Sequence, residues 1–96
     1  GDFAGRTRFP LELAEALRAV WPQDKPVFLR VSAVDGVEGG WSMDDTVAYA
    51  KELKARGIDV IDCSSGGLFG SATAARIKRS WGFQVPYAER VRREAG

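Results

Sequence analysis

Apolar residues recur with two different periods along the chain, and the two periods alternate. A helical period predicts helices over 10–20, 42–56 and 85–95. Two short runs rich in β-branched and aromatic residues, 26–32 and 58–63, predict strands. Because a whole helix separates the two strands, we expect them to be parallel and joined by a right-handed crossover. The pattern therefore predicts an α/β fold with the order α-β-α-β-α.

The first predicted helix carries a long apolar stripe. The stripe consists of Leu13, Leu17 and Val20, with Phe9 at its start and Trp21 at its end. Such a stripe is the face that a helix normally buries. Pro10 suits the first turn of a helix, whereas a helix that began near Phe3 would be kinked at Pro10. Residues 1–8 are therefore expected to form a lead-in to the helix.

The second and third predicted helices have clear end signals. Ser42 and Asp45 resemble a capping box, and Gly57 suits the position just after a helix. The apolar stripe of this second helix is Met43, Val47, Ala50 and Leu53. Pro86 suits the first turn of the third helix, which should end before Gly96.

The first strand contains one charged side chain. Phe28, Arg30 and Ser32 share one face of this strand, opposite Val27, Leu29 and Val31. The apolar neighbours of Arg30 predict a buried strand, and burying a guanidinium without a partner is costly. We therefore expect Arg30 to be paired with an acid, to lie at a solvated strand end, or to bind an anionic ligand.

Two parallel strands cannot form a sheet that buries itself, because both are edge strands. We therefore expect the chain to be part of something larger, whose further strands come from other residues or other copies. The lack of an initial methionine favours a chain cleaved from a tag or an excised piece. Successive β-α units are typical of a (β/α)8 barrel or an open doubly wound sheet. In a barrel the functional face would carry Arg30, Ser32, Asp35, Asp62, Ser64 and Ser65.

Two loops contain candidate binding residues. The glycine-rich stretch 33–41 lacks the spacing of known nucleotide-binding loops, which favours a plain connection over a phosphate cradle. The long stretch 66–84 includes a possible short helix over 71–79. Its basic residues Arg76, Lys78 and Arg79 would contact an anion or, more simply, form a solvated face. The aromatic residues Trp81, Phe83 and Tyr87 would cover a site or pack the loop.

Composition narrows the function classes. The length of 96 residues indicates one small domain. The net charge of +1 gives no indication of a nucleic-acid or membrane partner. Cys63 is the single cysteine and there is no histidine, so neither an internal disulfide nor a zinc pattern is expected. Cys63 is interpreted as a core residue rather than a reactive thiol, in a protein of the reducing cytoplasm.

Five stretches carry a combined signature: RTRFPLEL (6–13), PVFLRVSA (26–33), EGGW (38–41), VIDCSSGG (60–67) and GFQVPYAERVRREAG (82–96). Together they resemble the Old Yellow Enzyme family, and most closely its bacterial branch of FMN-dependent ene-reductases. The resemblance covers nearly the whole chain. It implies a (β/α)8 TIM barrel of which residues 1–96 form a partial domain, from about helix 4 to helix 6.

The resemblance also implies an activity. Such enzymes take a hydride from NAD(P)H onto FMN and pass it to the C=C bond of an α,β-unsaturated carbonyl substrate. It assigns FMN binding to Arg30, near N1 and the C2 carbonyl of the flavin, and places the family's substrate-binding histidine pair before Gly1. No residue of this chain is then catalytic, no metal is involved, and the isolated chain should be inactive. The alternative is a non-catalytic α/β fragment that binds no flavin and self-associates through its strand edges.

Overall fold

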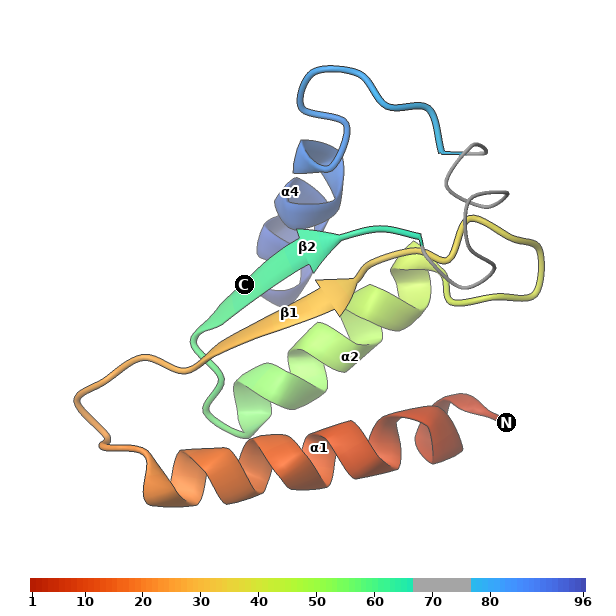
Figure 1. Cartoon of the computed structure of the whole chain (residues 1–96). Helices are drawn as coiled ribbons and strands as arrows, with labels where there is room; N and C mark the ends of the chain where they lie inside the picture. The colour runs from red at the N-terminus through yellow and green to blue at the C-terminus, as the bar shows by residue number, and fades with distance from the viewer. Residues whose placement is uncertain (67–76) are drawn as a thin grey trace.

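The computed structural model describes residues 1–66 and 77–96 (Figure 1). The elements are, in order, α1 (Phe3–Val20), β1 (Phe28–Ser32), α2 (Met43–Ala55), β2 (Val60–Ser64) and α4 (Val85–Ala95). The predicted order α-β-α-β-α is confirmed for these residues. The short helix predicted over 71–79 falls mainly outside the described residues.

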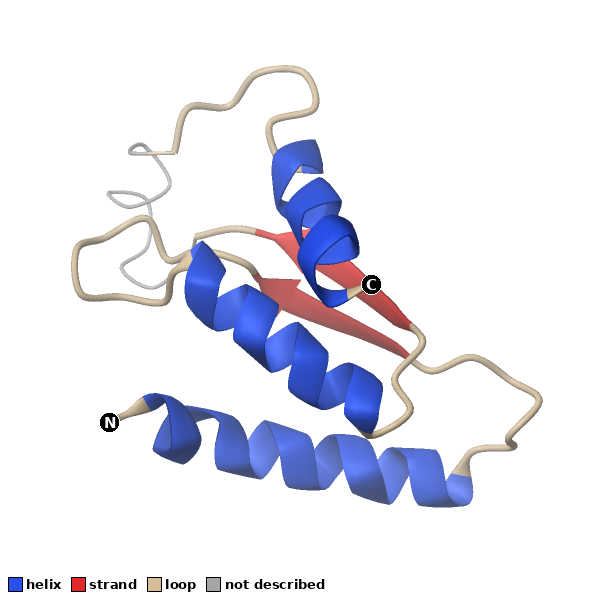
Figure 2. Cartoon of the chain, turned by 180° about the vertical axis from the view of Figure 1, so that it is seen from behind, coloured by secondary structure: helices blue, strands red, loops and turns tan. Residues whose placement is uncertain are grey.

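The two strands form a parallel sheet, as predicted. Phe28 lies opposite Val60 at one end of the ladder, and Ser32 lies opposite Ser64 at the other. Views from opposite sides show α2 and α4 on the same side of this sheet, while α1 lies alongside α2 (Figures 1 and 2). No described helix covers the other face of the sheet.

The core lies between the sheet and the helices. The predicted stripe of α2 is confirmed, since Val47, Ala50 and Leu53 are buried and Met43 packs against the core. One cluster contains Leu11, Ala14, Tyr49, Leu53 and Ile58, and the other contains Ala33, Ala50, Cys63 and Val91. Because α2 contributes to both clusters, it is the helix that joins α1, the sheet and α4.

Local signals mark both ends of α2 and the start of α4. The hydroxyl of Ser42 accepts a hydrogen bond from the Asp45 amide, and the Asp45 carboxylate accepts one from the Ser42 amide, so the capping box is confirmed. Gly57 follows α2 with φ of +85°, a conformation that favours glycine. Pro86 lies in the first turn of α4. No helix among the described residues is long and apolar enough to cross a membrane.

The predicted start of α1 is wrong. The helix begins at Phe3, so residues 3–8 are helical and Pro10 lies inside it. The physical reason is the Asp2 side chain, which caps the helix by accepting a hydrogen bond of 2.8 Å from the amide of Gly5. The prediction took Pro10 as the start of the helix and overlooked Asp2 as its N-cap.

The predicted buried face of α1 is also wrong. The exposed large apolar residues include the whole predicted stripe, Phe9, Leu13, Leu17, Val20 and Trp21. Phe9 is 73% exposed and Val20 is 80% exposed. The residues that α1 buries are Thr7, Leu11 and Ala14. The reason is that α1 packs mainly on α2, and it does so through Leu11 and Ala14 rather than through the stripe.

Candidate functional site

Arg30 lies in the middle of β1, on the exposed face that it shares with Phe28 and Ser32, while Leu29 and Val31 on the other face pack against the core. Its Nη1 donates a 2.8 Å hydrogen bond to the carboxylate of Asp62, directly opposite on β2. The Arg30 side chain is 67% exposed and that of Asp62 is 54% exposed. The prediction of a buried strand is therefore wrong for this face, and Arg30 is both paired and solvated.

The chemistry of this pair leaves the arginine able to bind a ligand. A guanidinium carries several N–H donors in a fixed planar fork, and among the described residues only Asp62 accepts from it. The remaining donors suit a planar group with acceptor atoms or negative charge along one edge. Asp62 holds the guanidinium at the sheet surface without removing it from water.

Asp35 has a structural role in the loop after β1. Its carboxylate accepts a 2.7 Å hydrogen bond from the Trp41 amide, and its own amide donates to the Trp41 carbonyl at 3.0 Å. A Cβ on Gly40 would meet this carboxylate at 2.9 Å, so the close approach requires glycine. The loop is closed upon itself, which supports the plain connection over the phosphate cradle.

The end of β2 borders a small cavity of about 320 Å³. Its lining includes Ser64, Ser65, Arg79, Phe83 and Gln84. The Gln84 amide donates to the Ser65 hydroxyl at 3.1 Å, which joins the start of α4 to the end of β2. The structure thus brings Ser64, Ser65 and Arg79 together at the carboxyl end of the sheet, whereas Ser32 is exposed on β1.

The remaining predicted residues separate into different environments. Phe83 lines this cavity, Tyr87 packs against the core, and Trp81 and Lys78 are exposed. Arg76 lies outside the described residues. Cys63 is buried, as predicted, and its burial and the adjacent charge of Asp62 raise the pKa of its thiol. Since the thiolate is the reactive form, these surroundings disfavour Cys63 as a nucleophile.

Sequence reasoning missed a second arginine that is more deeply involved in the structure. Arg18 is 13% exposed and its Nη1 lies 3.2 Å from the Asp59 carboxylate. Its Nη2 also donates to the carbonyls of Trp21, Pro22 and Lys25. The available signal was a cation in the last helical turn before a proline-containing turn, where backbone carbonyls lack helical partners.

The fold and the site together define a class. The described chain is a parallel β-α-β unit flanked by helices, with a solvated cation on the open face of its sheet. Units of this kind build α/β enzymes that bind their ligands at the sheet. The family of NADH:flavin oxidoreductases and NADH oxidases matches residues 1–94, and the chain belongs to that family.

Individual relatives agree with the family match. The chain is 44% identical over 95 residues to an NADPH dehydrogenase of Geobacillus sp. (strain WCH70), covering 99% of this chain and 26% of the relative. It is 43% identical over 96 residues to the NADPH dehydrogenase of Geobacillus thermodenitrificans, covering 100% of this chain and 26% of that protein. The chain thus spans about a quarter of the length of these curated relatives. The resemblance to flavin oxidoreductases is confirmed.

Proposed function

We propose that this chain is a segment of the (β/α)8 barrel of an FMN-dependent NAD(P)H oxidoreductase, in which Arg30 binds the flavin. The parent enzyme reduces the C=C bond of α,β-unsaturated carbonyls. The observation that carries the proposal is the exposed guanidinium of Arg30 on the open face of a parallel sheet, in a chain of this family. Residues 1–96 then correspond to about helix 4 through helix 6 of the barrel.

The two outer edges of the sheet support a barrel segment. Beside β1 lies an apolar groove of about 230 Å³, lined by Leu17, Val20, Trp21, Pro26, Val27 and Phe28. This groove continues the exposed stripe of α1. A further parallel strand paired with β1 would lie against this groove. The exposed stripe of α1 would then pack on that strand, because helices normally cover the faces of parallel sheets.

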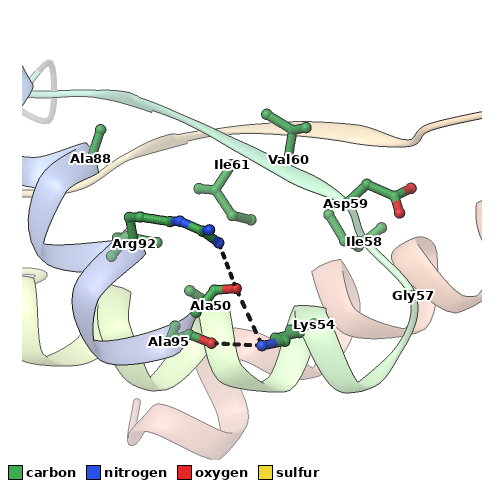
Figure 3. Close-up of a pocket in the computed structure, with 12 residues that line it drawn as sticks. Ala50, Lys54, Gly57, Ile58, Asp59, Val60, Ile61, Ala88, Arg92 and Ala95 are labelled. Carbon is green, nitrogen blue, oxygen red and sulfur yellow. Dashed lines mark hydrogen bonds between the residues drawn. The ribbon is translucent and has the colours of Figure 1, made fainter.

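A second groove lies on the helix-covered side of β2. It has a volume of about 510 Å³ and lies between α2, α4 and β2 (Figure 3). Ala50, Ile61 and Ala88 contribute to its apolar lining, and Lys54 closes one end by donating to the Ala95 carbonyl at 3.3 Å. Since β1 and β2 each have an outer edge without a partner among the described residues, the described sheet fits the middle of a larger one.

The proposed role of Arg30 is electrostatic. Bound FMN supplies two-electron hydride chemistry that amino-acid side chains lack. The Arg30 guanidinium would donate to the pyrimidine edge of the flavin and favour negative charge there. Asp62 would hold the guanidinium in place through the hydrogen bond already described.

The test uses the complete gene product, purified and titrated with FMN. Arg30→Ala should raise the Kd for FMN by about 10- to 100-fold, because it removes charge-assisted hydrogen bonds. Arg8→Ala is the matched control, since Arg8 is an exposed arginine on α1 that pairs with Glu12 at 3.0 Å. Equal affinities for the two variants would refute the role of Arg30.

The activity is tested separately on the same protein. Oxidation of NADPH or NADH should depend on an added enone, and the measurement is the fall in nicotinamide absorbance. A protein that binds FMN but leaves enones unreduced would refute the proposed substrate class and retain the flavin site. A protein that binds no FMN would refute the proposed function as a whole.

A second candidate is a non-catalytic fragment that self-associates. The supporting observations are the two open strand edges and the exposed stripe of α1. The isolated 96-residue chain should then sediment above its monomer mass of 10.5 kDa and show no flavin absorbance. A single species of monomer mass would count against self-association, and a yellow protein would count against the absence of flavin.

A further inference from the structure

A buried threonine in α2 connects three parts of the fold through its hydroxyl group. Thr46 is 1% exposed, and its Oγ1 donates a 2.7 Å hydrogen bond to the carbonyl of Ala33. The same oxygen accepts a 2.6 Å hydrogen bond from Nε1 of Trp41. The hydroxyl therefore relays one chain of hydrogen bonds from the indole ring to the backbone of Ala33.

Ala33 is the residue that follows β1, and its backbone is held from two directions. Its amide donates to the Ser64 carbonyl on β2 at 2.8 Å, while its carbonyl accepts from Thr46. One residue further, the Val34 carbonyl accepts from the Gly66 amide at 2.7 Å. The carboxyl end of β1 is thus bonded to β2 on one side and to α2 on the other.

The Trp41 side of this relay is itself held in place. The indole stacks on Phe3 with 5.9 Å between ring centroids and meets Tyr49 edge-on at 6.0 Å. Its backbone amide is bonded to Asp35, as described above. Since α2 starts at the Ser42–Asp45 capping box, Thr46 projects from the first turns of a well-capped helix.

We propose that Thr46 is a positioning residue for the flavin site. Its hydroxyl fixes the carboxyl end of β1 relative to the helices, and thereby sets the position of Arg30, three residues before Ala33. The inference rests on the proposed function, because it assumes that Arg30 binds the flavin. Valine has the shape of threonine without the hydroxyl, so Thr46→Val leaves the Ala33 carbonyl buried and unpaired and removes the acceptor of the partly buried Trp41 Nε1.

The test measures the Kd for FMN of variants of the complete gene product by quenching of flavin fluorescence. Thr46→Val should raise the Kd by about tenfold, the equivalent of one lost buried hydrogen bond. Thr46→Ser keeps the hydroxyl and should restore the affinity to within about twofold of the natural protein.

Thr7→Val is the matched control. Thr7 is also buried, at 3% exposure, but its hydroxyl donates only within α1, to the Phe3 carbonyl at 2.8 Å and the Ala4 carbonyl at 3.5 Å. The change of side chain is therefore the same, while the end of β1 keeps its bonds. Thr7→Val should bind FMN as the natural protein does, and urea denaturation establishes that each variant is folded at the titration temperature.

The outcomes separate this inference from the proposed function. If Arg30→Ala weakens FMN binding while Thr46→Val matches Thr7→Val, the positioning role is wrong and the flavin site stands. If Arg30→Ala leaves binding unchanged, both proposals are wrong. Trp41→Phe, which removes the donor to Thr46 and keeps an aromatic ring, should raise the Kd by about threefold. It decides the question alone if Thr46→Val cannot be purified, and an unchanged Kd would then overturn the inference.

Discussion

Two of the arginine–aspartate pairs among the described residues, Arg30–Asp62 and Arg18–Asp59, differ in what surrounds them. The Arg30–Asp62 pair has the shorter separation, 2.8 Å against 3.2 Å for Arg18–Asp59. However, Arg30 is 67% exposed whereas Arg18 is 13% exposed. Arg18 also binds three backbone carbonyls, and Asp59 accepts a further 2.9 Å hydrogen bond from the Val27 amide. The Arg18–Asp59 pair, although its two charged groups lie farther apart, therefore takes part in more hydrogen bonds than the Arg30–Asp62 pair.

The comparison shows that separation alone does not rank two ion pairs. A solvated pair gains little free energy, because water stabilises both charges almost equally well when they are apart. A shielded guanidinium loses its water, so every hydrogen bond that replaces the water matters to stability. The Arg18 pair is thus built for stability, whereas the Arg30 pair keeps a cation accessible at little cost.

Replacing each arginine by methionine should separate the two roles most strongly. Arg18→Met should lower the free energy of unfolding by about 2 kcal/mol, because three carbonyls and Asp59 lose their donor. Arg30→Met, the matched change on the open face, should cost less than about 0.5 kcal/mol. Urea denaturation of the complete gene product measures both values. Equal losses would mean that burial does not distinguish the pairs.

Neutralising the two aspartates should give a smaller difference in the same direction. Asp59→Asn keeps the shape of the side chain but weakens the bonds from Arg18 and from the Val27 amide, at a cost of about 1 kcal/mol. Asp62→Asn should stay within about 0.5 kcal/mol of the natural chain. The same denaturation measurement applies, and a larger loss for Asp62→Asn would reverse our assignment of roles.

The carboxylate of Asp45 is held mainly by hydrogen bonds, and the pH dependence of stability extends the comparison to it. The Ser42 amide, and then its hydroxyl, lower the pKa of Asp45 below its ordinary value of 3.8. A lowered pKa stabilises the fold above pH 3.8, and this contribution is lost as the pH falls through the lower folded-state value. Asp45→Asn should therefore slightly reduce the slope with which the free energy of unfolding falls as the pH is lowered.

Comparison with Ser42→Ala separates the contribution of the Ser42 hydroxyl from that of the Ser42 amide. This substitution removes the hydroxyl and leaves the backbone amide in place, so it should reduce that slope less than Asp45→Asn does. Urea denaturation between about pH 5 and pH 3 measures both slopes. An unchanged slope for both variants would show that the capping box contributes nothing to the pH dependence.

Local signals were sufficient for much of the fold and for one candidate site residue. The start of α2 was predictable because Ser42 and Asp45 interact within one helical turn. Arg30 was recognisable because strand alternation isolates a single cation among apolar residues. Arg18 was not, because its acidic partner lies 41 residues away in the sequence. The cavity that brings Arg79 close to Ser64 and Ser65 likewise depends on the return of the chain to β2.

The sequence by itself determined the order of the elements, the parallel pairing and the family. Periodicity, caps and the length of the crossover are properties of neighbouring residues, so no knowledge of the packing was needed. Only the tertiary structure decided which side of α1 is buried and which arginine is shielded. Burial depends on what distant segments place against a surface, and α1 carries apolar residues on more of its surface than α2 covers.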